Sequence, residues 1–435
     1  MTGPDIDARS VGSQIYGLIE ELFPIHRSQT GEGNRKTFEA ITKWIAVNVV
    51  ETPTGNTAFG WTIPMEWNIR DAYISFRGER IVDYRESNLH IVNGSQPCTV
   101  TMSYSDLRKH LFEHEKRPDG IPYRTAFFRD EWGFCVTRSQ MELLEQLDGP
   151  FDIVIDSSEK SGSLSHAEIK TQPGAQDSIL IWAHCCHPSL ANDNLSGIAT
   201  ATMLAKKLAS METRYNYHFV FAPATIGAIN WLATNHLESF RGGLVLSLLG
   251  DSEPFHYKKT PSGKSELDRV FALLAKQNSK QIRQIEFDPF GYDERQFCAP
   301  ASKLHVGRLT RSLPGEFDEY HSSKDNLDLV NAVNLDESYQ LLLNAIEILE
   351  ANETLINTQG HCEPFLQPYN LYRPYGDDNK FVVRSKSVMY VLNLANGKND
   401  LIEIADRSGH DFEDICAAAN KLKEIGILQP AGGVS

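Results

Sequence analysis

The sequence predicts an α/β protein: a largely parallel sheet covered by helices on both faces, with an inserted β-rich module and a small helical block near the C-terminus. Over residues 151–352, short apolar runs alternate with amphipathic segments, as in such a sheet. The run ILIWA (179–183) is short, bulky and without a helical period, so it predicts a strand buried on both faces. It stops at two histidines and an Asn-Asp-Asn turn, and open α/β sheets bind ligands at such carboxyl ends.

Length and charge narrow the class of protein. The chain has 435 residues, which predicts two or three domains. A formal net charge of −15 argues against a general surface for nucleic acid or anionic membranes. No apolar run approaches the ~20 residues needed to cross a bilayer, and residues 1–10 lack the apolar core of a signal peptide, so we expect a cytoplasmic protein. Seven cysteines, an odd number without repeated Cys-x-x-Cys spacing, argue against a disulfide framework.

Residues 10–50 predict two helices separated by the glycine-bearing loop RSQTGEG (27–33). This loop is either a plain connection or a segment that contacts the substrate. From Glu51 the pattern changes to short alternating runs broken by proline, glycine and asparagine, which predicts strands. We therefore expect an inserted β-rich domain at residues 51–150.

Two aromatic segments lie within or beside this module, IPYRT (121–125) and WGFC (132–135). Aromatic clusters in β-rich modules mostly form the core. Arg124, next to Tyr123, is nevertheless a candidate for a contact with the substrate.

We expect residues 1–50 and 151–355 to form one catalytic-type domain. Its predicted strands are 151–155, 178–183, 217–222, 243–249 and 303–307, and its predicted helices are 194–209, 226–234, 265–277 and 335–352.

After a Pro/Tyr/Gly-rich connector (364–379), residues 375–435 predict a winged helix-turn-helix-like domain with helices at 388–394, 401–408 and 412–425. Residues 380–435 carry seven Lys/Arg and seven Asp/Glu, whereas a DNA reader is normally basic. We therefore expect domain packing or assembly into a homo-oligomer rather than nucleic-acid binding.

The candidate metal ligands are His184, His187 and Asp193 near the end of the central strand, and His321 in the segment DEYHSSKDNLD. Histidine and carboxylate together suit Zn²⁺, and three protein ligands with one open position are typical of catalytic zinc. Bound zinc brings the pKa of water to about 7, which supplies hydroxide for hydrolysis.

The segment PFGYDERQFCAP (289–300) places three charged side chains between aromatic residues. A charge run is usually a solvated loop, but the flanking aromatics and Cys298 indicate partial burial. Glu294 is then a candidate base, and Arg295 a partner for a carboxylate or an oxyanion.

Together these motifs resemble a known family: aminopeptidase-like proteins of largely unassigned function, often labelled polysaccharide-biosynthesis proteins with an aminopeptidase-like domain. HCCHPSLANDNLSG resembles the central signature of that family, and WTIPMEWNIRDAYI, IPYRTAFF, WGFC, DERQFC, YHSSKDNLD and HCEP resemble its companion blocks. The resemblance implies a zinc-exopeptidase-like αβα sandwich with an inserted β-rich domain and a terminal winged-helix domain.

The core is more distantly similar to the di-zinc aminopeptidases. That similarity matches His184 or His187 to their first histidine, Asp193 to the aspartate that bridges the two metals, and His321 to their late histidine.

This chain departs from the middle part of the di-zinc pattern. Ala224 and Thr225 stand where a Glu-Glu pair is expected, and another aspartate ligand is missing around Ser247. Two zinc ions would have Asp193 as their only anionic ligand from these positions, which compensates their charge poorly. One zinc ion is therefore predicted.

The resulting hypothesis is a zinc-dependent, aminopeptidase-like amide hydrolase acting on a small amino-acyl or modified-sugar metabolite. Glu294 would act as the base, with Asp251 as a substitute, and the substrate would be held by Tyr123, Arg124, Asp293, Arg295 and Tyr320. The alternative is a catalytically impaired, peptidase-fold binding or regulatory protein that retains zinc.

Overall fold

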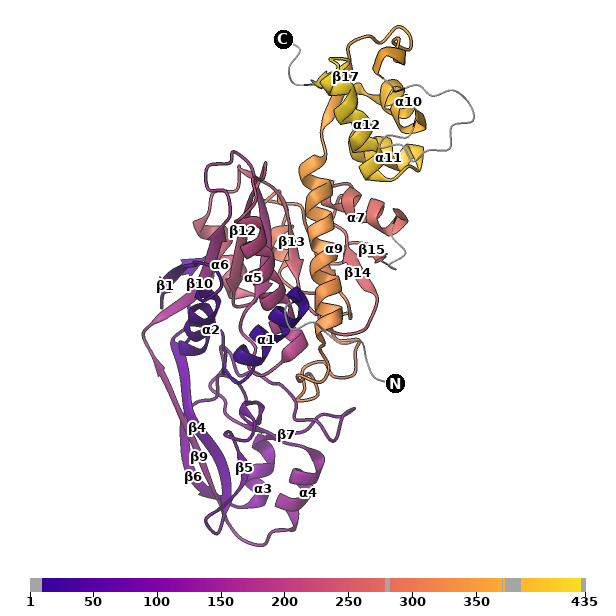
Figure 1. Ribbon diagram of the computed structural model, residues 1–435. Helices are drawn as coiled ribbons and strands as arrows, with labels where there is room; N and C mark the ends of the chain where they lie inside the picture. Colours follow the sequence, from indigo (N-terminus) through magenta and orange to yellow (C-terminus); the bar gives the residue numbers. More distant parts are fainter. Residues whose placement is uncertain (1–9, 278–281, 370, 372–384, 432–435) are drawn as a thin grey trace, which may run out of the picture. The chain divides into compact units, whose positions relative to one another are not determined.

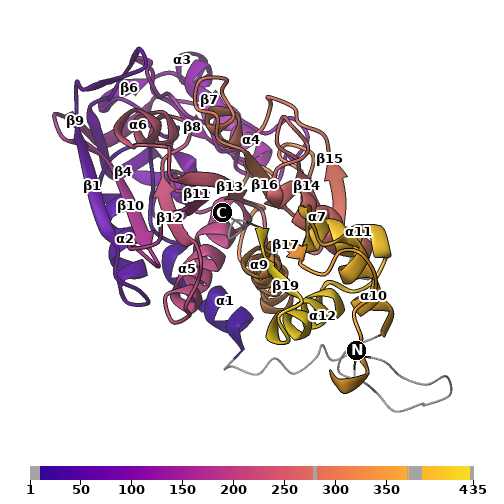
Figure 2. The ribbon, with the colours of Figure 1, turned by 90° about the horizontal axis from the view of Figure 1, so that it is seen from above.

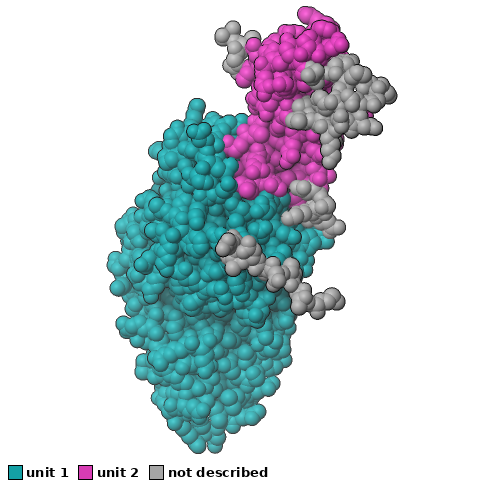
Figure 3. All heavy atoms as spheres, viewed as in Figure 1, with its two compact units in different colours: residues 1–263, 283–342 teal, residues 264–282, 343–435 magenta. Residues whose placement is uncertain are grey.

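The computed structural model describes residues 10–277, 282–369, 371 and 385–431. It divides into two compact units, residues 1–263 with 283–342, and residues 264–282 with 343–435 (Figure 3). Most of the predicted connector 364–379 lies outside the described residues. In the part of the chain that the structure describes, no helix is both long and apolar enough to cross a membrane.

The largest sheet has eight strands in the order β1-β10-β12-β11-β13-β16-β14-β15. At its centre β12, β11, β13 and β16 run parallel, whereas β1, β10 and β14 pair antiparallel with their neighbours. The strands are β1 (Asn48–Pro53), β10 (Ser163–Lys170), β11 (Ser178–His184), β12 (Asn216–Ala222), β13 (Phe240–Leu246), β14 (Phe255–Lys258), β15 (Ile282–Ile285) and β16 (Val306–Thr310). The predicted parallel sheet is therefore present, with antiparallel edges.

Helices cover the centre of this sheet on both faces (Figures 1 and 2). The helix α5 (Gly197–Leu208) packs against β11, β12 and β13, and α1 (Val11–Leu22) packs against α5. On the opposite face lies α6 (Ile226–Thr234), whose Trp231 meets Trp182 of β11 edge to face. Every residue of β11 and β12 is buried, as expected for strands covered on both sides.

A second sheet, in the order β5-β4-β9-β6, forms the inserted module. Its strands are β4 (Glu66–Phe76), β5 (Glu79–Asp83), β6 (Cys98–Met102) and β9 (Phe151–Lys160). The prediction that residues 151–155 belong to the parallel sheet is wrong, because β9 pairs with β4 and β6. An apolar run of this length fits a strand of either sheet, and pairing partners are not encoded in periodicity.

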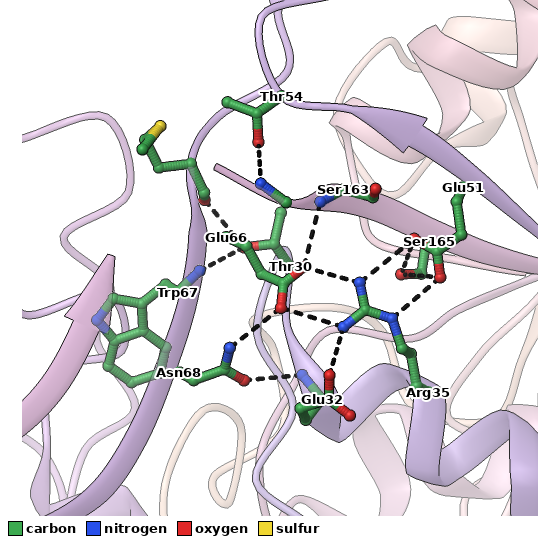
Figure 4. Close-up of polar contacts among 12 residues, drawn as sticks. Thr30, Glu32, Arg35, Glu51, Thr54, Glu66, Trp67, Asn68, Ser163 and Ser165 are labelled. Carbon is green, nitrogen blue, oxygen red and sulfur yellow. Dashed lines mark hydrogen bonds and ion pairs between the residues drawn. The ribbon is translucent and has the colours of Figure 1, made fainter. Parts of the chain in front are cut away.

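A polar cluster joins the inserted sheet to the main sheet (Figure 4). Arg35 of α2 (Glu32–Thr42) forms two hydrogen bonds with Glu66 of β4, at 2.7 and 3.1 Å, and also pairs with Glu51 of β1 at 3.0 Å. Ser163 of β10 donates its backbone N–H to Glu66 Oε2 at 3.1 Å. The hydrogen bonds from Arg35, more than offsetting burial, lower the pKa of Glu66 from 4.5 to about 2.

The second unit contains the predicted C-terminal helices as α10 (Ser385–Leu394), α11 (Leu401–Ser408) and α12 (Phe412–Glu424). Asp400 caps α11 by accepting from the backbone N–H of Glu403, and Gly409 ends it in the left-handed conformation that favours glycine. A three-stranded sheet in the order β18-β17-β19 completes a winged-helix domain; its strands are β17 (Thr354–Asn357), β18 (Asn396–Asp400) and β19 (Leu428–Pro430). The helix α9 (Ala332–Ala351) runs from the first unit into this one.

The substitution Glu66→Gln should lower the free energy of unfolding by about 2 kcal/mol near neutral pH, because Arg35 loses its most buried partner. Since the pKa of Glu66 lies below its ordinary value, its ionic contribution is complete above about pH 5 and disappears as the pH falls through about 2. Urea titrations at several pH values measure this difference. The matched control is Glu79→Gln, on an exposed position of β5. A difference that stays constant down to pH 2 would contradict the role given to the ion pair.

Candidate metal centre

The four predicted metal ligands come together at the carboxyl edge of the parallel strands. His184 is the last residue of β11, and His187 follows in the next turn. Asp193 lies in the short helical turn η3 (Ala191–Ser196) that precedes α5, and His321 lies in the long loop between β16 and α9.

Asp193 is the centre of this cluster. Its Oδ1 lies 2.9 Å from His184 Nε2, and its Oδ2 lies 3.2 Å from His321 Nε2. Within the described ranges, one group of at least three His, Cys, Asp or Glu side chains has the spacing of a metal site: His184, His187 and Asp193, whose ligand atoms lie within 4.8 Å of one another. The ring of His321 lies 5.3 Å from that of His187, so the three imidazoles surround one carboxylate.

The cluster fits a zinc ion. Zinc bonds of about 2.0–2.1 Å separate two ligand atoms by about 3 Å, close to both distances at Asp193. Among the described residues, neither Asp193 Oδ2 nor His321 Nε2 has a hydrogen-bond partner of good geometry, although Asp193 is fully buried. A buried, unsatisfied carboxylate oxygen is costly, and a cation bound there would remove the cost.

The protonation states suit metal binding as well. Burial lowers the pKa of His187 well below its ordinary value, which keeps the imidazole neutral. Burial works against ionisation of Asp193, but the neighbouring histidines more than offset it and hold its pKa well below the ordinary value. Neutral imidazole and ionised carboxylate are the forms that bind a metal ion.

The backbone at Asp193 is fixed by Asp325, four residues beyond His321. Asp325 accepts the backbone N–H of Asn192 at 2.6 Å and that of Asp193 at 2.9 Å. Burial raises the pKa of Asp325 to about 8.

The side chain of Asn194 contacts the ring nitrogen of His184 that does not face Asp193. Its Nδ2 lies 3.3 Å from His184 Nδ1 and donates to the carbonyl of Leu246 at 3.1 Å. A Cβ at position 197 would lie 2.3 Å from Asn194 Oδ1, so the close approach of α5 requires Gly197.

Arg27, the first residue of the loop RSQTGEG, holds the backbone next to His187. Its guanidinium donates to the carbonyls of His187 at 2.8 Å, Pro188 at 2.9 Å and Leu22 at 2.8 Å. Burial lowers its pKa to about 10, so the group remains charged near neutral pH. This loop is therefore more than a connection, since its first residue positions a metal-ligand candidate.

Three tyrosines line the cluster. The ring of Tyr123 lies 4.9 Å from that of His187, and the ring of Tyr320 stacks on His321 at 3.9 Å. Tyr292 stacks on His184 at 4.7 Å and donates its hydroxyl to Asp193 Oδ1 at 3.1 Å. Burial raises the pKa of all three phenols, which keeps them protonated as hydrogen-bond donors.

The two acidic residues after Tyr292 have different surroundings. Asp293 is fully buried; it accepts the indole N–H of Trp182 at 2.8 Å, and its other oxygen has no partner among the described residues. Burial raises the pKa of Asp293 to about 6. Glu294 Oε1, in contrast, accepts from Lys258 at 2.9 Å and Arg308 at 3.0 Å. The role of Glu294 as base stays a prediction.

The two predicted substrate-binding arginines lie differently from the tyrosines. Arg124 is exposed, with its guanidinium 4.1 Å from the ring centre of Phe112, and Arg295 is exposed on α8 (Glu294–Phe297). Within the described chain, neither guanidinium hydrogen-bonds to the three histidines or to Asp193. Their contact with substrate therefore stays a prediction as well.

The positions that lack the expected carboxylates lie at the same edge of the sheet. Ala224 and Thr225 follow the end of β12, and Ser247 follows the end of β13. Both strands run parallel to β11, so these residues lie beside His184. Because Ala224, Thr225 and Ser247 have no carboxylate, Asp193 is the predicted metal ligand that supplies one.

Several positioning residues were not predicted from the sequence. Arg27, Asn194, Asp325 and Tyr292 act through hydrogen bonds that span many residues in the chain. Asp325 was within the quoted segment DEYHSSKDNLD, and its spacing of four from His321 on one loop is the signal that could have singled it out.

The fold and the histidine–aspartate cluster define the class of protein: the chain has the fold of the zinc aminopeptidases. The zinc aminopeptidase from Bacillus subtilis is 13% identical with a TM-score of 0.54, covering 78% of this chain and 95% of its own. The peptidase M28 precursor from Shewanella amazonensis is 14% identical with a TM-score of 0.51, covering 77% and 92%. At these identities the likeness concerns the fold alone.

More specifically, the chain belongs to the family defined by a domain of unknown function, DUF4910, whose model matches residues 16–352. A winged helix-turn-helix model matches residues 353–430. A Clostridium acetobutylicum relative, provisionally named a polysaccharide biosynthesis protein with an aminopeptidase-like domain, is 40% identical over 97% of this chain and 98% of its own. A crystal structure from the same organism, provisionally named a peptidase, is 39% identical with a TM-score of 0.90 and covers 96% of both chains.

The substitution Asp325→Asn should weaken zinc binding by about 10- to 100-fold, because an amide nitrogen would face a backbone N–H and displace Asp193. Competition against a chelating dye measures the affinity, and circular dichroism checks the fold. The control is Asp318→Asn, on the same loop with a side chain 83% exposed. Unchanged affinity in Asp325→Asn, or an equal loss in the control, would contradict the positioning role.

Proposed function

We propose that this chain is a single-zinc, aminopeptidase-like amide hydrolase that acts on a small amino-acyl or modified-sugar metabolite. The observation that carries the proposal is the set of three histidines around one carboxylate, at an edge of the sheet where Ala224, Thr225 and Ser247 supply no further anion. Three neutral imidazole nitrogens and one carboxylate compensate the charge of one Zn²⁺ ion better than that of two. The cellular compartment that we propose remains the cytoplasm.

In this proposal His184, His187, Asp193 and His321 are the residues that would hold the ion. When bound, zinc polarises an amide carbonyl and lowers the pKa of a water molecule. The phenols of Tyr123 and Tyr320 line the site and could donate hydrogen bonds to the oxygen on which negative charge develops.

The proton acceptor that we propose is Asp293. Each of the two carboxylates has one buried oxygen without a partner among the described residues, but Glu294, the base predicted from the sequence, also forms ion pairs with Lys258 and Arg308 through Oε1, whereas Asp293 forms none. A carboxylate whose pKa is raised by burial toward neutral pH, as that of Asp293 is, suits a general base.

Metal analysis and hydrolysis assays test the proposal. The purified protein should contain one zinc per chain, and should release product from aminoacyl 4-nitroanilides or from N-acyl amino sugars. Asp193→Ala should lose both zinc and activity, because it removes the carboxylate of the cluster. A protein without zinc, or an unchanged zinc content in Asp193→Ala, would contradict it.

A second candidate is supported by the absence of the Glu-Glu pair: a binding or regulatory protein that keeps the peptidase fold and the zinc. Zinc without hydrolysis in the natural chain, and hydrolysis in Ala224→Glu, would favour this second candidate.

The substitution Asp293→Asn should lower kcat by about 10²- to 10⁴-fold while zinc content is unchanged, because the amide still accepts from Trp182 but takes up no proton. Asp288→Asn, at an exposed position immediately before the segment 289–300, is the matched control. A loss of kcat in Glu294→Gln but not in Asp293→Asn would instead assign the base to Glu294.

A further inference from the structure

The inserted module reaches the candidate metal centre through one segment. Residues 117–123, here called the strap, lie against residues 318–324 of the loop that carries His321, and Pro122 forms an isolated antiparallel β-bridge with Ser322. Both segments belong to the first unit. The module therefore contacts the candidate metal ligand that lies farthest along the chain.

Three hydrogen bonds flank this bridge. The backbone N–H of Tyr123 donates to the carbonyl of His321 at 2.7 Å, and the backbone N–H of Ser323 donates to the carbonyl of Ile121 at 2.8 Å. The backbone N–H of Ile121 donates in turn to Oγ of Ser323 at 3.0 Å. Because the first of these bonds ends on the carbonyl of His321, the strap holds that residue directly.

The backbone of His321 is strained. Its φ is +52°, in the left-handed region, which residues other than glycine adopt at a cost. Such residues persist where the surrounding contacts hold them. In this conformation His321 Nε2 lies 3.2 Å from Asp193 Oδ2. The hydrogen bond from Tyr123 is a contact that holds the strained backbone and, with it, the imidazole.

The strap is in turn fixed to the module. Ile121 and Tyr123 are buried with Leu89 of the module in one apolar cluster. Just beyond the strap, the carbonyl of Arg124 accepts the backbone N–H of Asn93 at 2.8 Å. Close-packed interiors resist local displacement. The position of the strap is therefore set by the module and not by the loop that it holds.

Ion pairs join the same two segments beside the bridge. The guanidinium of Arg117 lies 3.0 Å from the carboxylate of Glu319 and 3.2 Å from that of Asp318, and the ammonium of Lys324 lies 2.7 Å from the carboxylate of Asp119. These side chains are between 28% and 83% exposed, and exposed ion pairs stabilise a contact only weakly. The hydrogen bonds of the bridge are therefore the principal connection.

We propose that the inserted module completes the metal centre: the strap positions His321 as a metal ligand, and Ser323 is a positioning residue that acts through His321. The inference rests on the proposed zinc site and deepens it. His184, His187 and Asp193 lie within ten residues of one another in the sequence, so the contribution of the module falls on the fourth ligand.

Zinc affinity of the full chain, measured by competition against a chelating dye, tests the role of Ser323. Ser323→Ala removes the acceptor of the Ile121 N–H and should weaken zinc binding by about tenfold, as expected for a group that orients a metal ligand. Ser323→Thr keeps the oxygen and should bind zinc as the natural chain does. Ser239→Ala, at an exposed position between α6 and β13, is the matched control and should also bind normally.

A second background separates positioning from a general loss of stability. In His321→Ala, zinc would keep His184, His187 and Asp193. Adding Ser323→Ala to this variant should change the affinity by less than about twofold, because the ligand through which Ser323 acts is gone. A general destabilisation, or an effect transmitted through Asp325, would lower the affinity equally in both backgrounds.

These measurements do not involve hydrolysis, so the positioning role and the proposed activity fail separately. A natural chain that binds zinc without hydrolysing amides would contradict the activity and leave the positioning role intact. Unchanged affinity in Ser323→Ala, an equal loss in Ser323→Thr or Ser239→Ala, or a loss that persists in the His321→Ala background would overturn the positioning role alone. A natural chain that binds no zinc would overturn both.

Discussion

The candidate site depends on the burial of one carboxylate, that of Asp193, among three imidazoles. An ionised group without solvent access must be compensated locally, since desolvation of a single charge costs several kcal/mol. Here His184 and His321 approach its two oxygens, and Tyr292 donates to one of them. The end of β11, the turn η3 and the loop after β16 meet at this point, so the fold of the first unit and the geometry of the site are set together.

The inserted module is joined to the main sheet by a different kind of interaction. Arg35 brings together carboxylates from β1, β4 and its own helix, so the junction consists of paired charges rather than apolar surface. The module has its own core, in which Phe134, Phe151 and Leu144 are fully buried. The junction therefore mainly fixes the orientation of β4, which begins at Glu66.

The sequence was most informative where chemistry and periodicity coincide. The run before His184 predicted the central strand, and the turn at Asp193 predicted a histidine–aspartate cluster whose members the structure brings together, because strand ends are determined by local pattern. The pairing of β9 was assigned wrongly, since an apolar run does not specify its neighbours. The roles of Arg27 and Asp325 arise from contacts between segments up to about 160 residues apart, and no local pattern predicts such contacts. The ion pairs of Glu294 similarly involve two other strands, β14 and β16.

The loop that carries His321 and Asp325 contacts both the side chain and the backbone of Asp193. His321 meets its carboxylate, and Asp325 binds its backbone N–H. A displacement of this single loop would remove one candidate ligand and release the other at the same moment. The affinity of this candidate centre for a metal ion is then expected to depend on the position of the loop as a whole rather than on four independent side chains.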